Sequence, residues 1–477
     1  MANRYLIVSD LHLCDAEEHP DGWMAHKSSA YIFDAEFDLL VRDFMSKVRA
    51  KDEVMLVLNG DIFDFDLVTA TPEHPPWEVS RQEKKRGLRP TAKKSAWKLQ
   101  HILQDHPKFM DTLAHFLLAG HRIVYVMGNH DREFHFEAVR RTFLRELKAS
   151  AKRQDGKIEK EAVRFEPWFF YVPGELYVEH GQQFDYYTSF RYLLDPTIKK
   201  GGEKVISLPM GNLSNRYLMS NMGYFNPFAT DYILNVFRYV AHWFKYYALT
   251  KRSLVFNWFL GSLSVMAKLL ENKGLMLKPP RGYKRRLKDT AERYGLTLEH
   301  VENLRRMHKL PITNRFYRIV REFWLDRLGI AFFMLLVAVI LALVPIPLWI
   351  KLMVPFSTFP LLFFIYEYLA QGESVFSVEH ELPKYARKVA DTLPVRLISF
   401  GHTHQPRLIP LARGVTFIDS GTWAPIMSKA REDLPEQGYR NYIYASFSKN
   451  RHEIKFDSWV PQERQSQLNG DHSGEER

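Results

Sequence analysis

The chain has 477 residues, which at about 150 residues per domain is enough for one large or two to three ordinary domains. Apolar residues make up 46% of it and charged residues 25%, ordinary globular values that exclude global disorder and fibrous repeats. The 66 Lys and Arg against 55 Asp and Glu leave a net charge of +11, which favours an anionic partner such as a phosphate ester, nucleic acid or anionic lipid.

The cysteine content and the first residues indicate an intracellular protein. A single cysteine, Cys14, excludes an intramolecular disulfide framework and fits a reducing compartment. The first residues lead directly into a strand-like run at 5–8 and contain no long apolar signal core. We therefore expect a chain that is not exported.

The N-terminal part alternates between expected strands and helices. Short apolar runs that stop at turn residues predict the strands, and they lie at 5–8, 54–58, 123–127, 176–178, 395–400 and 415–418. Apolar residues at helical spacing predict helices within 37–48 and 109–117. Because strands and helices alternate, we expect an α/β sheet with helices on its faces.

Residues 191–383 differ in character, with many aromatic and basic residues and few clear strands. Lys351 alone separates two uncharged pieces, 328–350 and 352–366. The first is long enough to cross a bilayer core of about 30 Å, but Pro345 and Pro347 break it near its end. This pattern favours a hairpin at 328–366 that enters a membrane and returns, and the alternative is a pair of buried core helices.

Basic and aromatic residues surround this apolar hairpin. Seven Lys and Arg between Arg305 and Arg327 form the basic flank expected on the cytoplasmic side. Aromatic residues between Trp243 and Phe259, mixed with Lys and Arg, are typical of amphipathic helices at a membrane interface or of an ordinary helical subdomain. The eight Lys and Arg of the run 81–98 predict a solvated face, or a surface that attracts a phosphate-bearing substrate.

Metal-ligand side chains follow the expected strands, namely Asp10, His12, Asp61, Asn129, His130, His180, His402 and His404. Asp10 and His12 are two residues apart, so extended backbone would point both to the same side. Glycines adjoin the key residues, at Gly60, Gly128, Gly181 and Gly401, as expected where backbone bends sharply or approaches an ion closely. Since α/β sheets place their sites at the carboxyl ends of strands, we expect these side chains to converge.

Convergence constrains the apolar hairpin as well. The motifs lie on both sides of 328–366 and must meet in one site. The chain therefore crosses a membrane an even number of times or not at all. A hairpin satisfies this parity, whereas a single crossing does not.

Together these residues resemble the five sequence blocks of the calcineurin-like metallophosphoesterases. The blocks read Asp10-Leu-His12, Gly60-Asp61-Ile-Phe-Asp64, Gly128-Asn129-His130-Asp131, His180-Gly181 and Gly401-His402-Thr-His404. The resemblance covers 4–190 and 384–425, and it implies a four-layer αββα sandwich with a large helical, partly apolar insertion. The expected organisation is a core formed by 1–190 and 384–460, an insertion at 191–383 and a disordered tail at 461–477.

The resemblance also implies a dinuclear metal site. One ion would be held by Asp10, His12 and His404, the other by Asn129, His180 and His402, with Asp61 bridging both. These ligands suit two divalent ions, with Mn²⁺ expected first and Fe or Zn²⁺ as alternatives. Two such ions lower the pKa of a bridging water, and the resulting hydroxide attacks phosphorus in line.

Three further residues are assigned supporting roles. His130 is expected to donate a proton to the leaving oxygen, with Asp131 orienting its ring. Asp64 is expected to accept a hydrogen bond from a ligand histidine. For Asp64 and Asp131 the alternative is helix capping.

Three functions compete at this point. The sequence favours a membrane-associated enzyme that hydrolyses a phosphodiester or pyrophosphate bond of a lipid-linked substrate at the cytoplasmic face of the membrane. Within the family, 9–13 and 401–404 look most like the bacterial UDP-2,3-diacylglucosamine pyrophosphatases, which are shorter and tend to have Arg in place of His130. The alternatives are a soluble cytoplasmic nuclease or nucleotide phosphodiesterase, and a membrane scaffold with an inactive domain. Nucleic acid is not favoured as a partner, because a nuclease has no use for the apolar hairpin.

Overall fold

A computed structural model gives the structure of the chain. It describes residues 3–19, 24–49, 52–221, 254–275, 277–314, 316–323, 325–369, 378–424, 426–427, 435–436, 440–448 and 451–459. Most of the aromatic segment that begins at Trp243, and the tail at 461–477, lie outside these residues.

The larger sheet has six strands in the order β15-β14-β1-β2-β3-β4. Its parallel strands are β1 (Asn3–Val8), β2 (Val54–Asn59), β3 (Arg122–Val126) and β4 (Val163–Glu166). At one edge β14 (Asn441–Phe447) pairs antiparallel with β1, and β15 (His452–Ser458) pairs antiparallel with β14. Leu6, Ile7 and Val8 are completely buried, as expected for a parallel strand covered on both faces.

The smaller sheet has five strands in the order β10-β11-β9-β6-β5. These strands are β5 (Phe169–Val172), β6 (Leu176–Glu179), β9 (Leu397–Phe400), β10 (Arg407–Pro410) and β11 (Thr416–Asp419). β6 and β9 are parallel neighbours, with Leu176 opposite Leu397. This register joins the two ends of the core across the insertion and brings His180 close to His402. Two short strands, β12 (Ile426–Met427) and β13 (Pro435–Glu436), form a separate pair.

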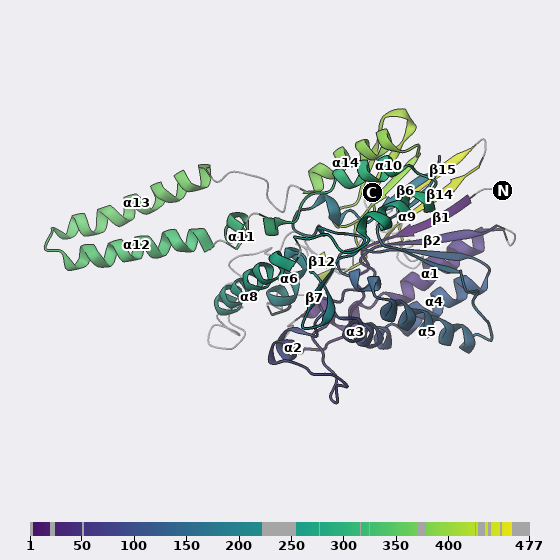
Figure 1. Ribbon diagram of the computed structural model, residues 1–477, viewed down its shortest axis with the longest axis horizontal. Helices are drawn as coiled ribbons and strands as arrows, with labels where there is room; N and C mark the ends of the chain where they lie inside the picture. The colour runs from purple at the N-terminus through teal and green to yellow at the C-terminus, as the bar shows by residue number, and fades with distance from the viewer. Residues whose placement is uncertain are drawn as a thin grey trace, which may run out of the picture.

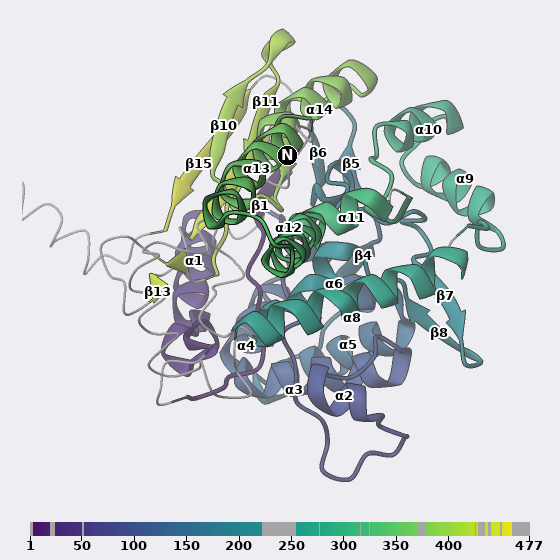
Figure 2. The ribbon, with the colours of Figure 1, turned by 90° about the vertical axis from the view of Figure 1, so that its left-hand side faces the viewer.

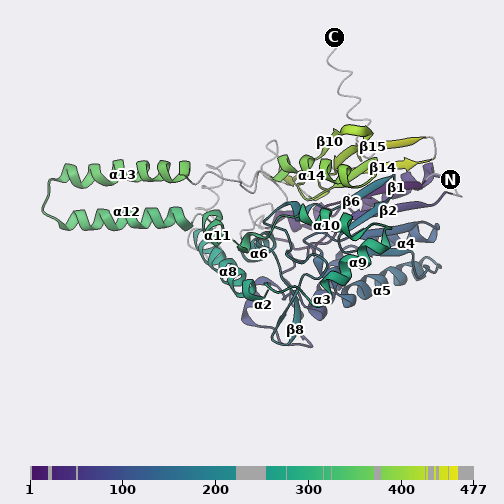
Figure 3. The same ribbon diagram turned by 45° about the horizontal axis from the view of Figure 1, so that its top comes forward.

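The two sheets pack face to face between helices, in four layers (Figure 3). Tyr5 of β1 meets Phe170 of β5 with 6.3 Å between ring centroids. The larger sheet is covered by α1 (Asp34–Lys47), α3 (Ala92–Asp105), α4 (Pro107–Leu118) and α5 (Glu137–Arg153). The smaller sheet is covered by α14 (Val378–Thr392), where Tyr385 stacks on Phe184. The predicted α/β sandwich with a helical insertion is confirmed.

The insertion packs on the core. It contains β7 (Thr197–Lys200), β8 (Glu203–Ile206), α6 (Met210–Tyr217), α8 (Leu254–Leu275), α9 (Tyr283–Arg293), α10 (Leu298–Arg306) and α11 (Phe316–Glu322). The Tyr294 hydroxyl donates to the carbonyl of Phe169 at 2.7 Å, and Arg293 pairs with Glu166 at 3.0 Å. The boundary expected between 383 and 384 falls inside α14.

The apolar segment forms an antiparallel helical hairpin that projects away from the body (Figure 1). Its helices are α12 (Leu325–Leu343) and α13 (Leu348–Leu369), and the turn between them contains Pro345 and Pro347. Both helices are long and apolar enough to cross a membrane by length and composition. Only 6% and 0% of their apolar windows are buried, so they are not the core helices of the alternative interpretation.

Candidate metal centre

The expected ligands converge at one edge of the two sheets. They follow the carboxyl ends of strands β1, β2, β3, β6 and β9, and they are Asp10, His12, Asp61, Asn129, His180, His402 and His404. The expected proton donor, His130, follows β3 beside Asn129. Asp10, Asp61, Asn129 and His180 are each at most 1% exposed. Such a concentration of buried polar groups costs free energy unless each group has a partner.

One group of ligand atoms comes from Asp10, His12 and His404, all within 4.8 Å of one another. His404 Nε2 lies 3.4 Å from Asp10 Oδ1 and 3.0 Å from His12 Nε2. His12 Nδ1 lies 3.1 Å from Asp64 Oδ2. Because Nδ1 donates to this carboxylate, Nε2 of His12 directs its lone pair toward the group.

A second group comes from Asp61, His180 and His402. His180 Nδ1 donates to the carbonyl of Asn59 at 3.0 Å, and its Nε2 lies 2.9 Å from Asp61 Oδ2. Asp61 Oδ2 is also 4.0 Å from His12 Nε2, so Asp61 lies between the two groups. His402 Nε2 lies 3.2 Å from Asp185 Oδ2, which leaves the lone pair on Nδ1.

These residues are suited to holding divalent metal ions. Asn129 Oδ1 is a buried atom without a hydrogen-bond partner. A buried polar atom left in this state costs about 1–3 kcal/mol, and a bound cation would offset that cost. The donors are carboxylate, amide and imidazole without thiolate, a set suited to Mn²⁺, Fe or Zn²⁺.

The electrostatics of the site also favour cations. Burial opposes ionisation of Asp61, but His180 and His130 outweigh it and hold the pKa of Asp61 well below its usual range. Burial likewise opposes protonation of His180, yet the charges of Asp61 and Asp10 raise the pKa of His180 to about 9. The carboxylates thus stay ionised and draw positive charge into the site.

A left-handed backbone conformation orients five of the ligand residues. Asp10, His12, Asp61, His402 and His404 all have positive φ, between 48° and 75°. The expectation that extended backbone points Asp10 and His12 to the same side is therefore wrong, because β1 ends at Val8 and left-handed residues follow. The same holds after β9, which ends at Phe400 before the left-handed His402 and His404. Left-handed residues other than glycine are uncommon, and such strain clusters at functional sites.

Three of the adjoining glycines are required by close approach. A Cβ on Gly60 would lie 2.5 Å from the His180 ring, and one on Gly128 would lie 2.1 Å from Asp61 Oδ1. A Cβ on Gly401 would lie 2.3 Å from Asp10 Oδ2. At Gly181 the reason is the turn itself, with φ at 110°. The predicted role of these glycines is confirmed.

His130 stands beside the ligand groups, but a different carboxylate holds it than expected. Its Nδ1 lies 3.1 Å from Asp64 Oδ2 and 3.5 Å from Asp66 Oδ2. Asp131 accepts hydrogen bonds from Tyr125 Oη and from the backbone N–H groups of Ile62 and Gly128. The expectation that Asp131 orients His130 is therefore corrected, since its carboxylate fastens the loops after β2 and β3 to each other.

Three polar residues at the site escaped the sequence analysis. Asp66 continues the acidic series after Asp61 and Asp64, and Asp185 follows His180 by five residues. Their closeness in sequence to predicted site residues could have identified both. Asn212 had none, because it comes from α6 in the insertion. Its Nδ2 donates to Asp66 Oδ2 at 2.6 Å and to the carbonyl of Asn129 at 3.0 Å.

The basic run 81–98 is not a uniformly solvated face. Within it α2 (Arg81–Arg86) is mostly exposed. Lys94 and Lys98 are buried, with Lys94 Nζ 2.6 Å from Glu83 and Lys98 Nζ donating to the carbonyl of Phe65 at 2.6 Å. Those two lysines are structural, because their ammonium groups are already used inside the core.

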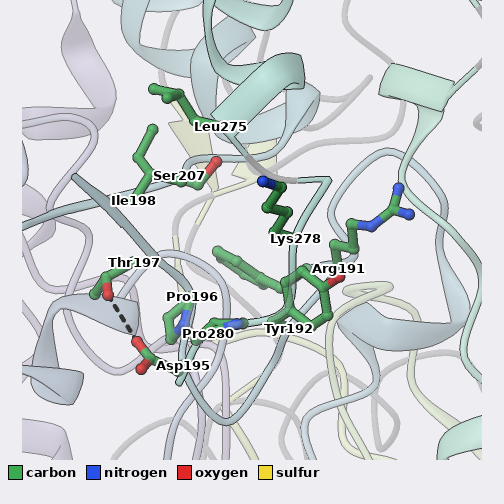
Figure 4. A pocket seen from close by; sticks show the side chains of 11 residues that line it. Arg191, Tyr192, Asp195, Pro196, Thr197, Ile198, Ser207, Leu275, Lys278 and Pro280 are labelled. Atoms are coloured by element: carbon green, nitrogen blue, oxygen red, sulfur yellow. Dashed lines mark hydrogen bonds between the residues drawn. The ribbon is translucent and has the colours of Figure 1, made fainter. Parts of the chain in front are cut away.

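A small cavity at the C-terminal end of α8 lies apart from the metal centre. Figure 4 shows Arg191, Tyr192 and Lys278 around it. Its volume of about 20 Å³ has room for about one water. None of the expected metal ligands lines it.

A mixed α/β sandwich with acidic and imidazole ligands at its strand ends defines a metal-binding hydrolase fold. A family model described as calcineurin-like phosphoesterase matches residues 4–244, and the chain belongs to this family of metal-dependent phosphoester hydrolases. The resemblance found in the sequence is thus confirmed at the level of the family. The search of curated proteins returned no match. His402 and His404 lie beyond the matched residues, and only the fold brings them to the site.

Proposed function

We propose that the chain hydrolyses a phosphodiester or pyrophosphate bond of a lipid-linked substrate, using two divalent ions. The observation that supports it most is the pair of ligand groups on either side of Asp61, with His130 adjoining both. Asp10, His12 and His404 would hold one ion, and Asn129, His180 and His402 the other. Bound there, two divalent ions would neutralise phosphoryl oxygens and lower the pKa of water.

The chain itself would supply the proton. Burial opposes protonation of His130, but Asp64 and Asp61 raise its pKa well above the usual range. Because Nδ1 lies 3.1 Å from Asp64 Oδ2, the other ring nitrogen is the one proposed to donate to a leaving oxygen. We therefore propose His130 as general acid, with Asp64 positioning its ring.

The test is hydrolysis of an aryl phosphodiester with Mn²⁺. We expect Asp61→Asn to lower kcat by about 10²–10³-fold, because a buried charge at the reacting centre is lost. His130→Ala should lower kcat by about 10²–10⁴-fold, as expected for a lost general acid. His115→Ala, on the remote helix α4, is the matched control. Equal rates in all four proteins would contradict the proposal.

The proposed lipid link comes from the hairpin. Large apolar side chains such as Phe332, Leu343 and Phe356 are 69%, 82% and 81% exposed, far more than a soluble surface normally shows in one place. A bilayer would cover them. The residues at 9–13 and 401–404 that resemble nucleotide-lipid pyrophosphatases favour an amphiphile with phosphate in its head group.

We propose further that the hairpin crosses the bilayer completely. At its base Arg327 lies 5.8 Å from the ring of Tyr366, and at its tip Lys351 donates to the carbonyl of Ala342 next to the exposed Trp349. Aromatic and basic residues at both ends are typical of two interfaces. The 19 residues of α12 span about 29 Å at 1.5 Å each, which matches a hydrocarbon core of about 30 Å. The basic residues at the base of the hairpin favour the cytoplasmic side of the membrane for the body.

A further inference from the structure

Helix α8 carries an exposed apolar stripe outside the hairpin. Leu260 is 54% exposed, Leu263 39% and Leu270 49%. Ser262, Val265 and Leu269 on the opposite side are at most 1% exposed. The exposed residues recur at helical spacing, so they form one continuous face.

The buried side of α8 rests on α6. Gly261 permits the contact, because a Cβ there would lie 3.0 Å from the carbonyl oxygen of Tyr217 at the end of α6. Since α6 occupies this side, the apolar stripe faces away from α6. In Figures 1 and 3, α8 lies at the left-hand edge of the body, which is the side from which the hairpin projects.

The direction of α8 differs from that of the hairpin. Figure 2 looks toward the hairpin side, and α8 runs broadside across that view while α12 is seen nearly end-on. A bilayer that the hairpin enters would therefore lie parallel to α8. A helix with one apolar face in that orientation fits the headgroup region of the membrane.

Helix α6 also links α8 to the metal centre. Its Asn212 donates to the carbonyl of Asn129 at 3.0 Å and to Asp66 at 2.6 Å. A single helix thus separates the apolar stripe from a proposed metal ligand.

We propose that α8 lies flat in the headgroup region of the bilayer and holds the metal centre toward the membrane. The occupant of its apolar stripe is the lipid surface, because the stripe is on the hairpin side and the chain carries a net charge of +11 that favours anionic lipid. The substrate class that fits is an amphiphile whose phosphate reaches the centre while its acyl chains stay in the bilayer. This substrate rests on the proposed hydrolysis, but lipid contact by α8 is independent of it.

In the test, one cysteine at a time is introduced into the full chain, and a fluorescent label is attached to it. The sites are Leu263→Cys on α8, Leu336→Cys on α12, and Leu39→Cys on α1 as an exposed control that is 49% exposed. The wild-type chain treated with the same reagent is the blank, because burial raises the pKa of the Cys14 thiol well above its usual range and slows its reaction. Each protein is reconstituted into vesicles of about seven parts neutral to three parts anionic phospholipid.

Quenchers attached at shallow or deep positions on the lipid chains report the depth of each label. We expect the label at 263 to be quenched at least about twofold more by the shallow quencher, because interfacial helices sit about 5–10 Å into the headgroup boundary. The label at 336 should respond most to the deep quencher, and the label at 39 to neither. Unchanged melting temperatures of the variants establish that each protein is folded.

Three results would overturn the proposal. If the lipid-attached quenchers quench the label at 336 but not the label at 263, then water or another part of the chain covers α8. Equal quenching at 39 and 263 means unspecific adsorption. Quenching at neither 263 nor 336 removes membrane contact altogether, even if aryl phosphodiester hydrolysis is intact. Conversely, an inactive protein with the expected quenching would reject the hydrolysis alone.

Discussion

His106 is buried between two acceptors that both require a proton on its ring. Nδ1 lies 2.8 Å from Asp34 Oδ1, and Nε2 lies 2.9 Å from the carbonyl of Cys14. Burial alone would lower the pKa of His106, but the bond to Asp34 and its charge raise it. The imidazolium therefore ties α1 and α4 to the loop after β1.

This pair makes stability depend on pH. Because the pKa of His106 is higher in the folded than in the unfolded protein, protonation of His106 favours folding. This stabilisation is fully present at pH values below the pKa of His106 in the unfolded chain, about 6.5, and it is lost as the pH rises through the pKa in the folded protein. We expect His106→Gln to lower Tm more at pH 6 than at pH 9. Thermal unfolding with a chelator present in every sample keeps metal loss out of the comparison. A Tm difference that is constant with pH, or larger at pH 9, would contradict the assignment.

For single residues, the sequence predicts which residue types form the site more easily than it predicts which carboxylate contacts which imidazole. Chemistry and position after strands indicate eight ligand-type residues, and the fold brings the seven Asp and His residues among them into adjoining clusters. Asp131 was assigned to His130 because it is next in sequence, whereas Asp64 reaches His130 from another loop. Adjacent residues in a turn point in different directions, so the pattern cannot decide which carboxylate meets which ring.

At the scale of the secondary-structure elements, several turns require a left-handed backbone conformation, and some of them also leave no room for a Cβ atom. Gly60 has φ at 76° and supports the approach of His180. Gly174 has the same φ of 76° with nothing within 4 Å of a Cβ there. The two glycines thus share backbone strain and differ in what surrounds them.

We expect Gly174→Ala to cost about 1–2 kcal/mol of stability from left-handed strain alone and to bind metal normally. Gly60→Ala should cost more and also lose at least about tenfold in metal affinity, since displaced ligands cost about 10–100-fold. Calorimetric unfolding and metal titration of both variants make the comparison. Equal metal affinity in the two would show that His180 tolerates the added methyl group.

Each strand that the sequence predicts is a buried strand of one of the two sheets. The interiors of β1, β2, β3, β6, β9 and β11 are continuous apolar runs, so the sequence predicted these strands. The edge strands β4, β10 and β15 consist mostly of exposed and half-buried residues and include charged side chains, and the sequence analysis did not predict them. Such edge strands bury too little surface to leave an apolar run, and only pairing with neighbours reveals them. The sequence analysis did not predict β5 or β14 either, although β5 is an apolar run.

For the whole molecule, the hairpin is separable from the core. Arg327 and Tyr366 meet at its base, so a short linker can replace 328–366. Because the removed side chains are mostly exposed, we expect the shortened protein to keep its Tm and its aryl phosphodiester activity within about twofold. It should move from the membrane to the soluble fraction in the absence of detergent.

Asp61→Asn in the complete chain is the reciprocal control, which we expect to be inactive and still in the membrane fraction. Reversible contact through α8 would not survive washing of the membranes. Loss of folding on removal of 328–366 would show that the hairpin supports the core, and unchanged fractionation would show that other segments hold the protein at the membrane.

Because β6 pairs with β9 across the insertion, the two parts of the site are synthesised at different times. His180 leaves the ribosome early, but it has no His402 beside it until the strand after the insertion has been made. The hairpin emerges between the two. A nascent chain therefore exposes its apolar helices at a stage when His402 and His404 have not yet been made and the set of ligand residues is incomplete.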